Sequence, residues 1–413
     1  MWNKNEKTIY NATIITMNSN MELIENGFIT ITQNKITNIG IGKPSHQTNL
    51  IDAKGKIIIP GFINAHTHLP MTNFRGLADD LPLKEWLEDH IWPAEAKNNN
   101  AEYVRKGARL GLQEMINTGT TTFSDMYFFA DVVAQETEKA GLRGVMNEAI
   151  LELPTNSYQT PDEALEMAEA FIQKWQGNSL IIPNLVFHAT YTCSLNTIEK
   201  IKHLSDKYNI NVTTHILETQ TENNDVIAYQ NMDAVDVLIE TGLFNKKLYA
   251  AHCVWLNKKE QKFFAENKVS IVHCPSSNLK LGSGIAPIPL YLEQGINVAL
   301  GTDGCASNNN LDMVEEMRLA ALIHKGVNHN PELIPAKEAL KMATINGAKA
   351  LGLEDKIGSL EIGKLADFLI IDTNNTFMQP IYDYYSAIVY SMNSSCIETV
   401  VVDGKNLIKK KKL

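Results

Sequence analysis

The chain has 413 residues, 44% of them hydrophobic and 20% charged, which are ordinary values for a globular protein. The net charge of -10 at pH 7 argues against a phosphate-tracking surface, so nucleic acid is not an expected partner. No apolar run reaches transmembrane length and the N-terminus lacks an apolar signal core, so a membrane partner is not expected either. Five cysteines without a C-x-x-C pair fit a reducing compartment, and we expect a cytoplasmic protein.

The N-terminal part of the chain predicts short alternating strands, at Thr8–Met17, Gly27–Thr32 and Lys35–Ile41. The same pattern returns towards the other end at Ala366–Asp372 and Ile397–Val402, where Asp403-Gly404 is typical of a hairpin turn. Neither end carries enough apolar surface to fold alone. We therefore expect residues 1–56 and 357–413 to form one small β-sandwich domain beside a catalytic domain of residues 57–356.

The most informative segment is Pro60-Gly61-Phe62-Ile63-Asn64-Ala65-His66-Thr67-His68. An apolar run from Lys56 to Ile63 predicts a buried strand, and two histidines spaced i, i+2 end it. Because residues two apart on a strand project from the same face, both imidazoles point one way. This arrangement suits two ligands of one metal ion, although a single His-x-His pair is common by chance.

A segment without strand pattern follows, from Leu69 to about Asn100, and carries Trp86 and Trp92. Loops of this length in a compact barrel are usually lids or binding segments, while a structural insertion packed on the rim would give the same pattern. We expect a functional lid.

Strand and helix patterns alternate from about Lys56 to about Asp355. The expected strands are Lys56–Asn64, Thr120–Met126, Leu142–Ile150, Leu180–Ala189, Asn209–Ile216, Lys247–Val254, Lys268–Cys274 and Asn297–Thr302. The expected helices include Ala101–Thr118, Pro161–Trp175, Leu195–Tyr208, Val226–Thr241 and Leu311–His324, with glycines such as Gly119 and Gly141 where helices should stop. Eight strands in strict alternation fit a TIM (β/α)8 barrel better than a doubly wound sheet, and no G-x-G-x-x-G follows any strand.

The predicted strand ends carry the residues that matter for chemistry, because active sites of TIM barrels lie at the C-terminal ends of the strands. In chain order these are His66, His68, Asp125, Glu148, His188, His215, His252, His273 and Asp303. Five of the eight strands end in histidine in a chain that has eleven histidines, so chance explains the set poorly.

A divalent metal is expected on four of these residues, namely His66, His68, His215 and Asp303. Three imidazoles and one carboxylate suit Zn²⁺, and Fe²⁺ is chemically possible. Such an ion keeps a position for water and lowers its pKa towards 7. Glu218 would face this water as general acid/base, and His252, fixed by apolar neighbours, would hold the nucleophile or stabilise the oxyanion.

The strand-end motifs together resemble those of the amidohydrolase superfamily. They are the His66/His68 segment, His215-Ile216-Leu217-Glu218, Ala251-His252-Cys253, Gly301-Thr302-Asp303-Gly304 and the later stretch Gly358–Asp367. Within that superfamily the chain is similar to the 5-methylthioadenosine/S-adenosylhomocysteine deaminases. This similarity rests on three stretches, Phe74–Asp80 with Trp86 and Glu95, His188–Ser194, and Ser307–Asn309 with Asp312-Met313.

The resemblance implies hydrolytic deamination at C6 of adenosine-type nucleosides (5-methylthioadenosine, S-adenosylhomocysteine or adenosine), giving the inosine analogue and ammonia. Glu218 would protonate N1, Asp303 would take the proton from the water, and His252 would steady the attacking oxygen. The implied substrate contacts are Glu95 on the ribose hydroxyls, His188 on the purine or sugar, Glu218 again, and Trp86, Asn147 and Ser307. Because His188 and no lysine stands at the fourth strand's end, we expect one metal ion rather than a lysine-bridged pair.

Two other interpretations stay open. The same site could deaminate or dechlorinate a free purine, pyrimidine or triazine ring, which has no ribose diol for Glu95 to bind. A metal-free binding protein is the third interpretation, and the complete ligand set argues against it. Family members often carry an arginine near the position of Asn147 and Glu148, so the sequence leaves the preferred 5′ substituent open. It also leaves the oligomeric state open, and a homo-oligomer is compatible with it.

Overall fold

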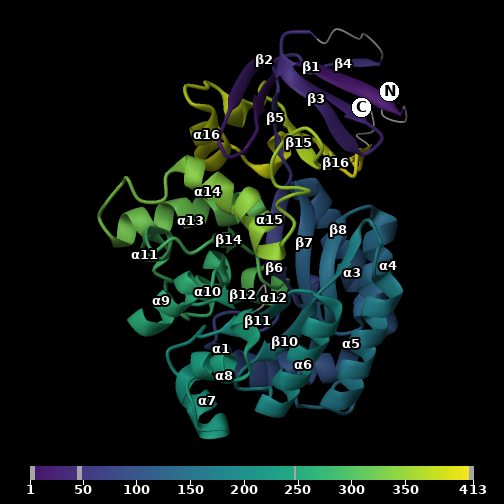
Figure 1. The fold of residues 1–413 in the computed structure, drawn as a ribbon. Coiled ribbons are helices and arrows are strands. Elements are labelled where there is room, and N and C mark those ends of the chain that lie inside the picture. The colour runs from purple at the N-terminus through teal and green to yellow at the C-terminus, as the bar shows by residue number, and fades with distance from the viewer. Residues whose placement is uncertain (1–4, 44–48, 246–247, 409–413) are drawn as a thin grey trace.

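The computed structural model describes residues 5–43, 49–245 and 248–408. A barrel of parallel strands lies beneath a smaller sheet that joins both ends of the chain (Figure 1). Lys247, at the start of one expected strand, lies outside the described residues, as do the first four residues.

Eight parallel strands follow one another around the barrel in chain order, and a short further strand, β9 (Ile181–Pro183), pairs with β8. The eight are β6 (Phe62–Thr67), β7 (Thr120–Tyr127), β8 (Arg143–Ile150), β10 (Leu185–Ala189), β11 (Val212–Ile216), β12 (Leu248–His252), β13 (Ser270–His273) and β14 (Val298–Leu300). The predicted (β/α)8 barrel is confirmed. The expected strand Leu180–Ala189 is divided into β9 and β10.

The first expected strand, Lys56–Asn64, is also divided, and the break lies at Gly61. A Cβ atom on Gly61 would lie 2.2 Å from the side chain of Thr121, so only glycine allows this close approach. The residues before the break, β5 (Ile57–Pro60), join the smaller sheet, while β6 enters the barrel. One apolar run therefore serves two sheets.

The barrel closes where β14 returns to β6. The backbone N–H of Asp303 donates to the carbonyl oxygen of His66 at 3.0 Å. The Asn64 side chain donates to Thr302 Oγ1 at 2.7 Å and accepts the Thr302 N–H at 3.0 Å. A Cβ on Gly301 would lie 2.8 Å from the His66 carbonyl oxygen, so glycine is needed for this approach. The closing seam thus brings the first and last strand ends together.

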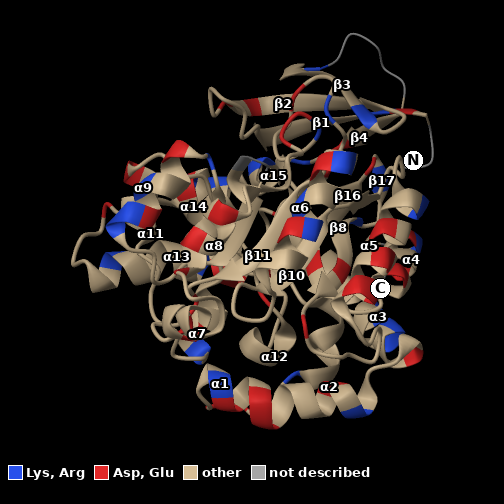
Figure 2. Cartoon of the chain, turned by 60° about the horizontal axis from the view of Figure 1, so that its bottom comes forward, with Lys and Arg blue, Asp and Glu red and all other residues tan. Residues whose placement is uncertain are grey.

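Helices cover the outside of the barrel, and Figure 2 shows acidic and basic residues interspersed along them. They are α3 (Ala101–Thr118), α4 (Ala130–Ala140), α5 (Pro161–Trp175), α6 (Leu195–Tyr208), α7 (Glu222–Gln230), α8 (Ala234–Glu240), α9 (Lys258–Glu266), α10 (Pro275–Lys280), α11 (Ile288–Glu293), α12 (Cys305–Asn308), α13 (Met313–Val327), α14 (Ala336–Met342) and α15 (Ile345–Leu351). The expected helix Val226–Thr241 is instead α7 and α8, because Asn231 ends α7 in the left-handed region with φ 57°. Among helices in the described ranges, none is both long and apolar enough for a bilayer crossing.

The segment between β6 and α3, expected as a lid loop, is largely helical. It contains η1 (Leu69–Phe74), α1 (Leu83–Glu85), the π-helical η2 (Trp86–Ile91) and α2 (Trp92–Asn98). In Figure 2, α1 and α2 lie across the end of the barrel where α12 is found. These turns are too short to give a clear helical period in the sequence.

The smaller sheet, called the terminal sheet below, takes strands from both chain ends, as predicted. Its strands are β1 (Glu6–Ile15), β2 (Leu23–Thr32), β3 (Lys35–Ile41), β4 (Leu50–Asp52), β5, β15 (Phe368–Ile371), β16 (Ile397–Val402) and β17 (Lys405–Asn406). Asp403 and Gly404, with φ 50° and 72°, form the expected hairpin turn. Arg143 of β8 pairs with Asp367, just before β15, with Nη2 and Oδ2 3.0 Å apart and both side chains buried, which couples the barrel to the sheet.

Candidate active site

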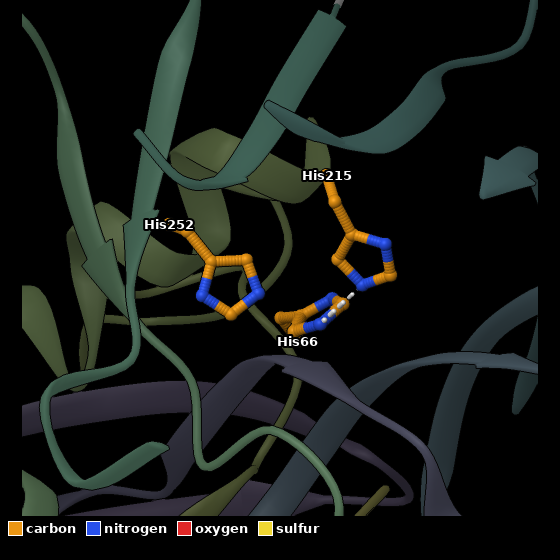
Figure 3. A group of neighbouring side chains, drawn as sticks. All are labelled: His66, His215 and His252. Atoms are coloured by element: carbon orange, nitrogen blue, oxygen red, sulfur yellow. Dashed lines mark hydrogen bonds between the residues drawn. The ribbon is translucent and has the colours of Figure 1, made fainter. Parts of the chain in front are cut away.

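Four expected ligand atoms meet inside the C-terminal end of the barrel. His66 comes from β6, His68 follows it directly, His215 comes from β11, and Asp303 follows β14. Asp303 Oδ1 lies 3.3 Å from His66 Nε2 and 3.1 Å from His68 Nε2. His66 Nε2 lies 3.2 Å from His215 Nε2, and Figure 3 shows these two rings turned towards each other with His252 beside them.

The outer hydrogen bonds of two histidines show which ring atoms are free. His68 Nδ1 donates to the Met126 carbonyl oxygen at 2.5 Å, and His215 Nδ1 donates to the His188 carbonyl oxygen at 2.8 Å. In the neutral rings both Nε2 atoms then carry lone pairs, and a backbone partner that fixes the tautomer is typical of metal-binding histidine. Asp303 Oδ1 is buried and has no hydrogen-bond partner within the described ranges. Two triads that share His66 bring their ligand atoms within 4.8 Å of one another, namely His66/His68/Asp303 and His66/His215/His252, and such donors fit a divalent metal.

The second oxygen of Asp303 is held by two serines. Ser277 Oγ donates to Asp303 Oδ2 at 2.6 Å, and Ser307 Oγ donates to it at 2.9 Å. Asp303 itself adopts φ 59°, a left-handed conformation that costs a non-glycine residue free energy and that often marks a functional site. Ser307, expected to contact substrate, lines the cleft but gives its hydrogen to the carboxylate. Ser277 was not expected, although it lies in the polar stretch directly after β13.

Glu218 lies next to the ligand group and is buried. Its Oε1 accepts a hydrogen bond from Ser283 Oγ at 3.1 Å, and its Oε2 lies 3.6 Å from His252 Nε2. Burial raises the pKa of the Glu218 carboxyl, although the neighbouring His252 opposes the rise. The carboxyl can therefore exchange a proton nearer to neutral pH than an exposed glutamate.

Hydrogen bonds from neighbouring side chains fix the His252 ring and the backbone at Glu218. His252 Nδ1 donates to Asn278 Oδ1 at 2.8 Å, which leaves Nε2 as an acceptor in the neutral ring. The buried carboxylate of Glu222 accepts the N–H groups of Leu217 and Glu218, both at 2.7 Å. Leu217 and His252 adopt φ 47° and 68°, so two further non-glycine residues in the left-handed region lie beside the ligand group.

Three of the four expected ligands, His68, His215 and Asp303, line a cleft of about 750 Å³, counted to its open mouth. Its apolar and aromatic lining is Met71, Leu83, Trp86, Leu87, Trp92, Met126, Tyr127, Phe128, Ala149, Leu151, Tyr191 and Leu281. Its polar lining is His68, Glu95, His188, His215, Glu218, His252, Asp303 and Ser307. Most of the expected site residues are therefore in one place.

Glu95 of α2 reaches this cleft as a buried carboxyl. Tyr127 donates its hydroxyl hydrogen to Glu95 Oε1 at 2.5 Å, and Asn99 Nδ2 donates to the Tyr127 oxygen at 3.0 Å. Burial raises the pKa of Glu95 to about 7, although the Tyr127 hydrogen bond opposes the rise. Neither Tyr127 nor Asn99 was expected as part of the site, since both are distant in sequence from their partner.

His188 and Trp86 offer one acceptor and one donor. Thr192 Oγ1 donates to the Ala189 carbonyl oxygen, so it accepts the Nδ1–H of His188 at 2.9 Å. Burial lowers the pKa of His188 to about 3, so its ring is neutral and Nε2 is an acceptor. Trp86 Nε1 is buried and has no hydrogen-bond partner in the described part of the chain. A polar ligand atom in the cleft would satisfy both groups.

The comparison with known proteins agrees with the family that the sequence motifs resemble. A sequence model of the amidohydrolase family matches residues 57–407. The chain belongs to the amidohydrolase family. The resemblance in the strand-end motifs is thereby confirmed. The barrel is the one expected, and the strands from both chain ends, expected as a small β-sandwich, form one sheet.

Two deaminases are similar to this chain over almost its whole length. One is a 5-methylthioadenosine/S-adenosylhomocysteine deaminase of Thermodesulfovibrio yellowstonii, 42% identical over 398 residues that cover 95% of this chain and 90% of that protein. Another is a 5′-deoxyadenosine deaminase of Methanosarcina acetivorans, 43% identical over 402 residues, covering 97% and 92%. Among solved structures, an adenosine deaminase of Xanthomonas campestris with bound zinc is 35% identical with a TM-score of 0.92, covering 97% of this chain and 92% of that one.

Asn147, expected as a substrate contact, is not among the residues that line the cleft. Its side-chain amide donates to the carbonyl oxygens of Asn184 at 2.7 Å and Ala168 at 3.3 Å. Its side-chain oxygen accepts the N–H of Glu148 at 2.8 Å. With both donors and the acceptor committed to the backbone, Asn147 supports β8 rather than facing a ligand.

Three further strand-end residues support the barrel of this amidohydrolase instead of facing its cleft. Asp125 accepts the N–H of Leu69 at 2.6 Å and so holds the chain that follows His68. Glu148 accepts the first N–H groups at the start of α4, at 3.0 and 2.9 Å. The ring of His273 lies 5.5 Å from that of His324 on α13. A polar residue at a strand end is thus not always a residue of the cleft.

Proposed function

We propose that this amidohydrolase hydrolyses adenosine-type nucleosides at C6, releasing ammonia and leaving the inosine analogue. The observation that carries the proposal is that two buried carboxyls, Glu218 and Glu95, line the cleft that holds the metal-ligand group. Glu218 would serve the reacting ring and Glu95 the sugar. The deaminase names of relatives 42% and 43% identical over almost the whole chain support the same activity.

The residues that would hold the metal are His66, His68, His215 and Asp303. We propose one ion per chain, and zinc is supported by the donor set and by the zinc in the Xanthomonas campestris structure. When bound, the ion lowers the pKa of water so that hydroxide is available at neutral pH. The proton transfers and the binding of the substrate would depend on side chains of this chain.

Glu218 would donate a proton to N1 of the purine, which makes C6 a better acceptor for the attacking oxygen. Burial raises the pKa of Glu218, which favours the protonated carboxyl that this step needs. Asp303 would accept the proton that the water loses, and His252 Nε2 would accept a hydrogen bond from the attacking oxygen. Once the C6–O bond has formed, Asp303 would pass its proton to the amino nitrogen, which leaves as ammonia when the C6–N bond breaks. The C6 hydroxyl would give its proton to Glu218, which restores that carboxyl and leaves the C6 carbonyl of the inosine analogue.

The sugar end of the cleft would bind the ribose. Glu95 offers a carboxylate for the 2′- and 3′-hydroxyls, which are donors, and His188 Nε2 is a further acceptor for a sugar hydroxyl. Trp86 would supply an N–H to an acceptor on the substrate. We assign Ser307 to the support of Asp303 and no substrate contact to Asn147.

A panel of adenosine, 5-methylthioadenosine, S-adenosylhomocysteine, guanine and cytosine, followed by ammonia release, tests the proposal. Release from the three nucleosides and not from the bases is expected. Release from a free base alone would favour the alternative in which the ring has no sugar.

We further infer a cytoplasmic protein, because all five cysteines are free and buried, as in a reducing compartment.

Residues 57–356 remain our proposed catalytic domain, with residues 1–56 and 357–413 beside it. β5 pairs with the terminal sheet, which indicates that the first division between the two parts follows Pro60 in space. A homo-oligomer stays a prediction, which light scattering on the purified protein would check.

A further inference from the structure

A side pocket opens from the cleft beside Glu95. Its empty volume is about 640 Å³, counted to its open mouth. It shares with the cleft the side chains of Trp92, Glu95, Phe128 and Leu151. Further out it is lined by Ala96, Asn99, Phe129, Leu153, Pro154, Thr155 and Asn156.

The wall of this side pocket is held at both of its edges. Asn156 Nδ2 donates to the carbonyl oxygens of Ala96 at 3.0 Å and Asn99 at 2.7 Å, which ties the segment after β8 to α2. The Tyr158 hydroxyl donates to the Ala149 carbonyl oxygen at 2.7 Å and accepts the N–H of Leu151 at 3.2 Å. The pocket is therefore a defined cavity between two connected elements.

The lining of the side pocket carries little charge. None of its described lining residues is a lysine or an arginine, and Glu95 is the one carboxyl among them. Glu152, in the same segment, accepts the Ser194 N–H at 2.9 Å and the Thr197 hydroxyl at 2.7 Å, so it faces the start of α6. A carboxylate that entered the pocket would meet apolar walls and an acidic group without a cation, which is unfavourable.

The second opening of the cleft carries one lysine beside three acidic groups among the described residues. It is lined by Lys84, Glu88, Glu222 and Asp225 among others. Lys84 is exposed, and its Nζ lies 4.0 Å from Glu88 Oε1. Acidic groups therefore outnumber basic groups among the described residues around both openings.

The proposed function fixes which opening receives the 5′ end of a nucleoside. With the C6 edge at Glu218 and the ribose at Glu95, the sugar end of the nucleoside would lie beside the side pocket, which includes Glu95, and not beside the second opening, whose lining lacks Glu95. We propose, on the basis of that function, that this pocket holds the 5′ substituent and selects uncharged, apolar groups. A 5′-methylthio or 5′-deoxy nucleoside would then be preferred to one with the charged amino-acid tail of S-adenosylhomocysteine.

The first measurement compares kcat/KM for three nucleosides by ammonia release. These are 5-methylthioadenosine, S-adenosylhomocysteine, and 5′-butylthio-5′-deoxyadenosine, which matches the homocysteine tail in sulfur and carbon count and lacks its charges. We expect S-adenosylhomocysteine to be roughly tenfold or more below the butylthio compound, because only its tail carries an ammonium and a carboxylate that would lose water among these walls. Equal values, or a preference for S-adenosylhomocysteine, would overturn the proposal.

A pair of variants locates the effect. Leu153, at the mouth of the pocket, is 48% exposed, so Leu153→Arg adds a guanidinium without leaving a cavity. It should raise the ratio of S-adenosylhomocysteine to butylthio turnover about tenfold. Leu110→Arg is the matched control, because Leu110 lies on α3, outside the pocket, and is 51% exposed. The same ratio in both variants would refute the role of the pocket. No deamination of any nucleoside would instead refute the proposed function itself.

Discussion

Replacing Glu95 by glutamine tests the sugar end of the site. Glutamine keeps the size of the side chain and an oxygen that can accept the Tyr127 hydroxyl, so the fold of α2 should persist. It removes the negative charge that we propose for binding the ribose hydroxyls. The comparison is made on an adenosine-type substrate and on its 2′,3′-dideoxy analogue, which has no hydroxyl for this group.

The size of the effect follows from the kind of hydrogen bond. A bond to a charged acceptor contributes about 1.5–3 kcal/mol, and about 1.4 kcal/mol corresponds to a factor of ten. Glu95→Gln should therefore lower kcat/KM about 10- to 100-fold on the substrate with the diol and leave the dideoxy analogue almost unchanged. Steady-state kinetics of ammonia release measures both.

The pH dependence gives a second, independent result. Burial raises the pKa of Glu95 to about 7, and the ionised form is the one that accepts from two hydroxyls. Because kcat/KM reports the free enzyme, its value for the diol substrate should rise as the pH increases through about 7. The part of the rise that depends on Glu95 should be missing with the dideoxy analogue and in Glu95→Gln, whereas a rise from ionisation of the attacking water should remain in both.

Glu102→Gln is a suitable control, because Glu102 is an exposed glutamate on the neighbouring helix α3. It should change neither the ratio of the two substrates nor the pH profile. Equal losses on the diol and dideoxy substrates in Glu95→Gln would refute the reasoning and leave Glu95 as a support of α2.

Glu218→Gln should keep the bound metal but lower turnover by about 100-fold or more, because the amide cannot give up the carboxyl proton; ammonia release with elemental analysis checks both, and near-normal turnover would place the acid elsewhere. Elemental analysis of the active protein should give one divalent metal per chain, and two metals or none would contradict the proposal of one ion on His66, His68, His215 and Asp303. Replacing Ser277 and Ser307 together by alanine should weaken metal binding roughly 10- to 100-fold, because Asp303 Oδ2 would lose both donors. Competition with a chelator measures this affinity, and an unchanged value would show that the hydroxyls are dispensable.

The parts of the fold that the sequence predicted best are the long helices with clear caps. α3, α5 and α6 have the expected bounds, because Asn100, Thr160 and Ser194 accept N–H groups in the first turn of each helix. The parts that it missed depend on contacts distant in sequence. The break at Gly61 follows from the close approach of Thr121, which no local pattern reveals.

The candidate site likewise has residues that the sequence predicted correctly and residues for which the prediction was wrong. His66, His68 and His215 were found because strand ends in a barrel converge, and this depends only on the fold class. The same reasoning also selected His273, which lies against His324 instead of the cleft. Strand-end position alone does not tell which side of the barrel wall a side chain faces.

The groups behind the site could not be found from local sequence, yet the geometry of the site depends on them. Leu217, His252 and Asp303 all hold left-handed backbone conformations, each of which costs a non-glycine residue on the order of 1 kcal/mol or more. Such conformations persist only where surrounding bonds fix them, and here the Glu222 carboxylate and the closing N–H of Asp303 to His66 do so. The positions of the acid and of the metal ligands therefore depend on bonds made one layer further from the substrate. Variants in that layer should change metal affinity and turnover even though they touch neither the metal nor the nucleoside.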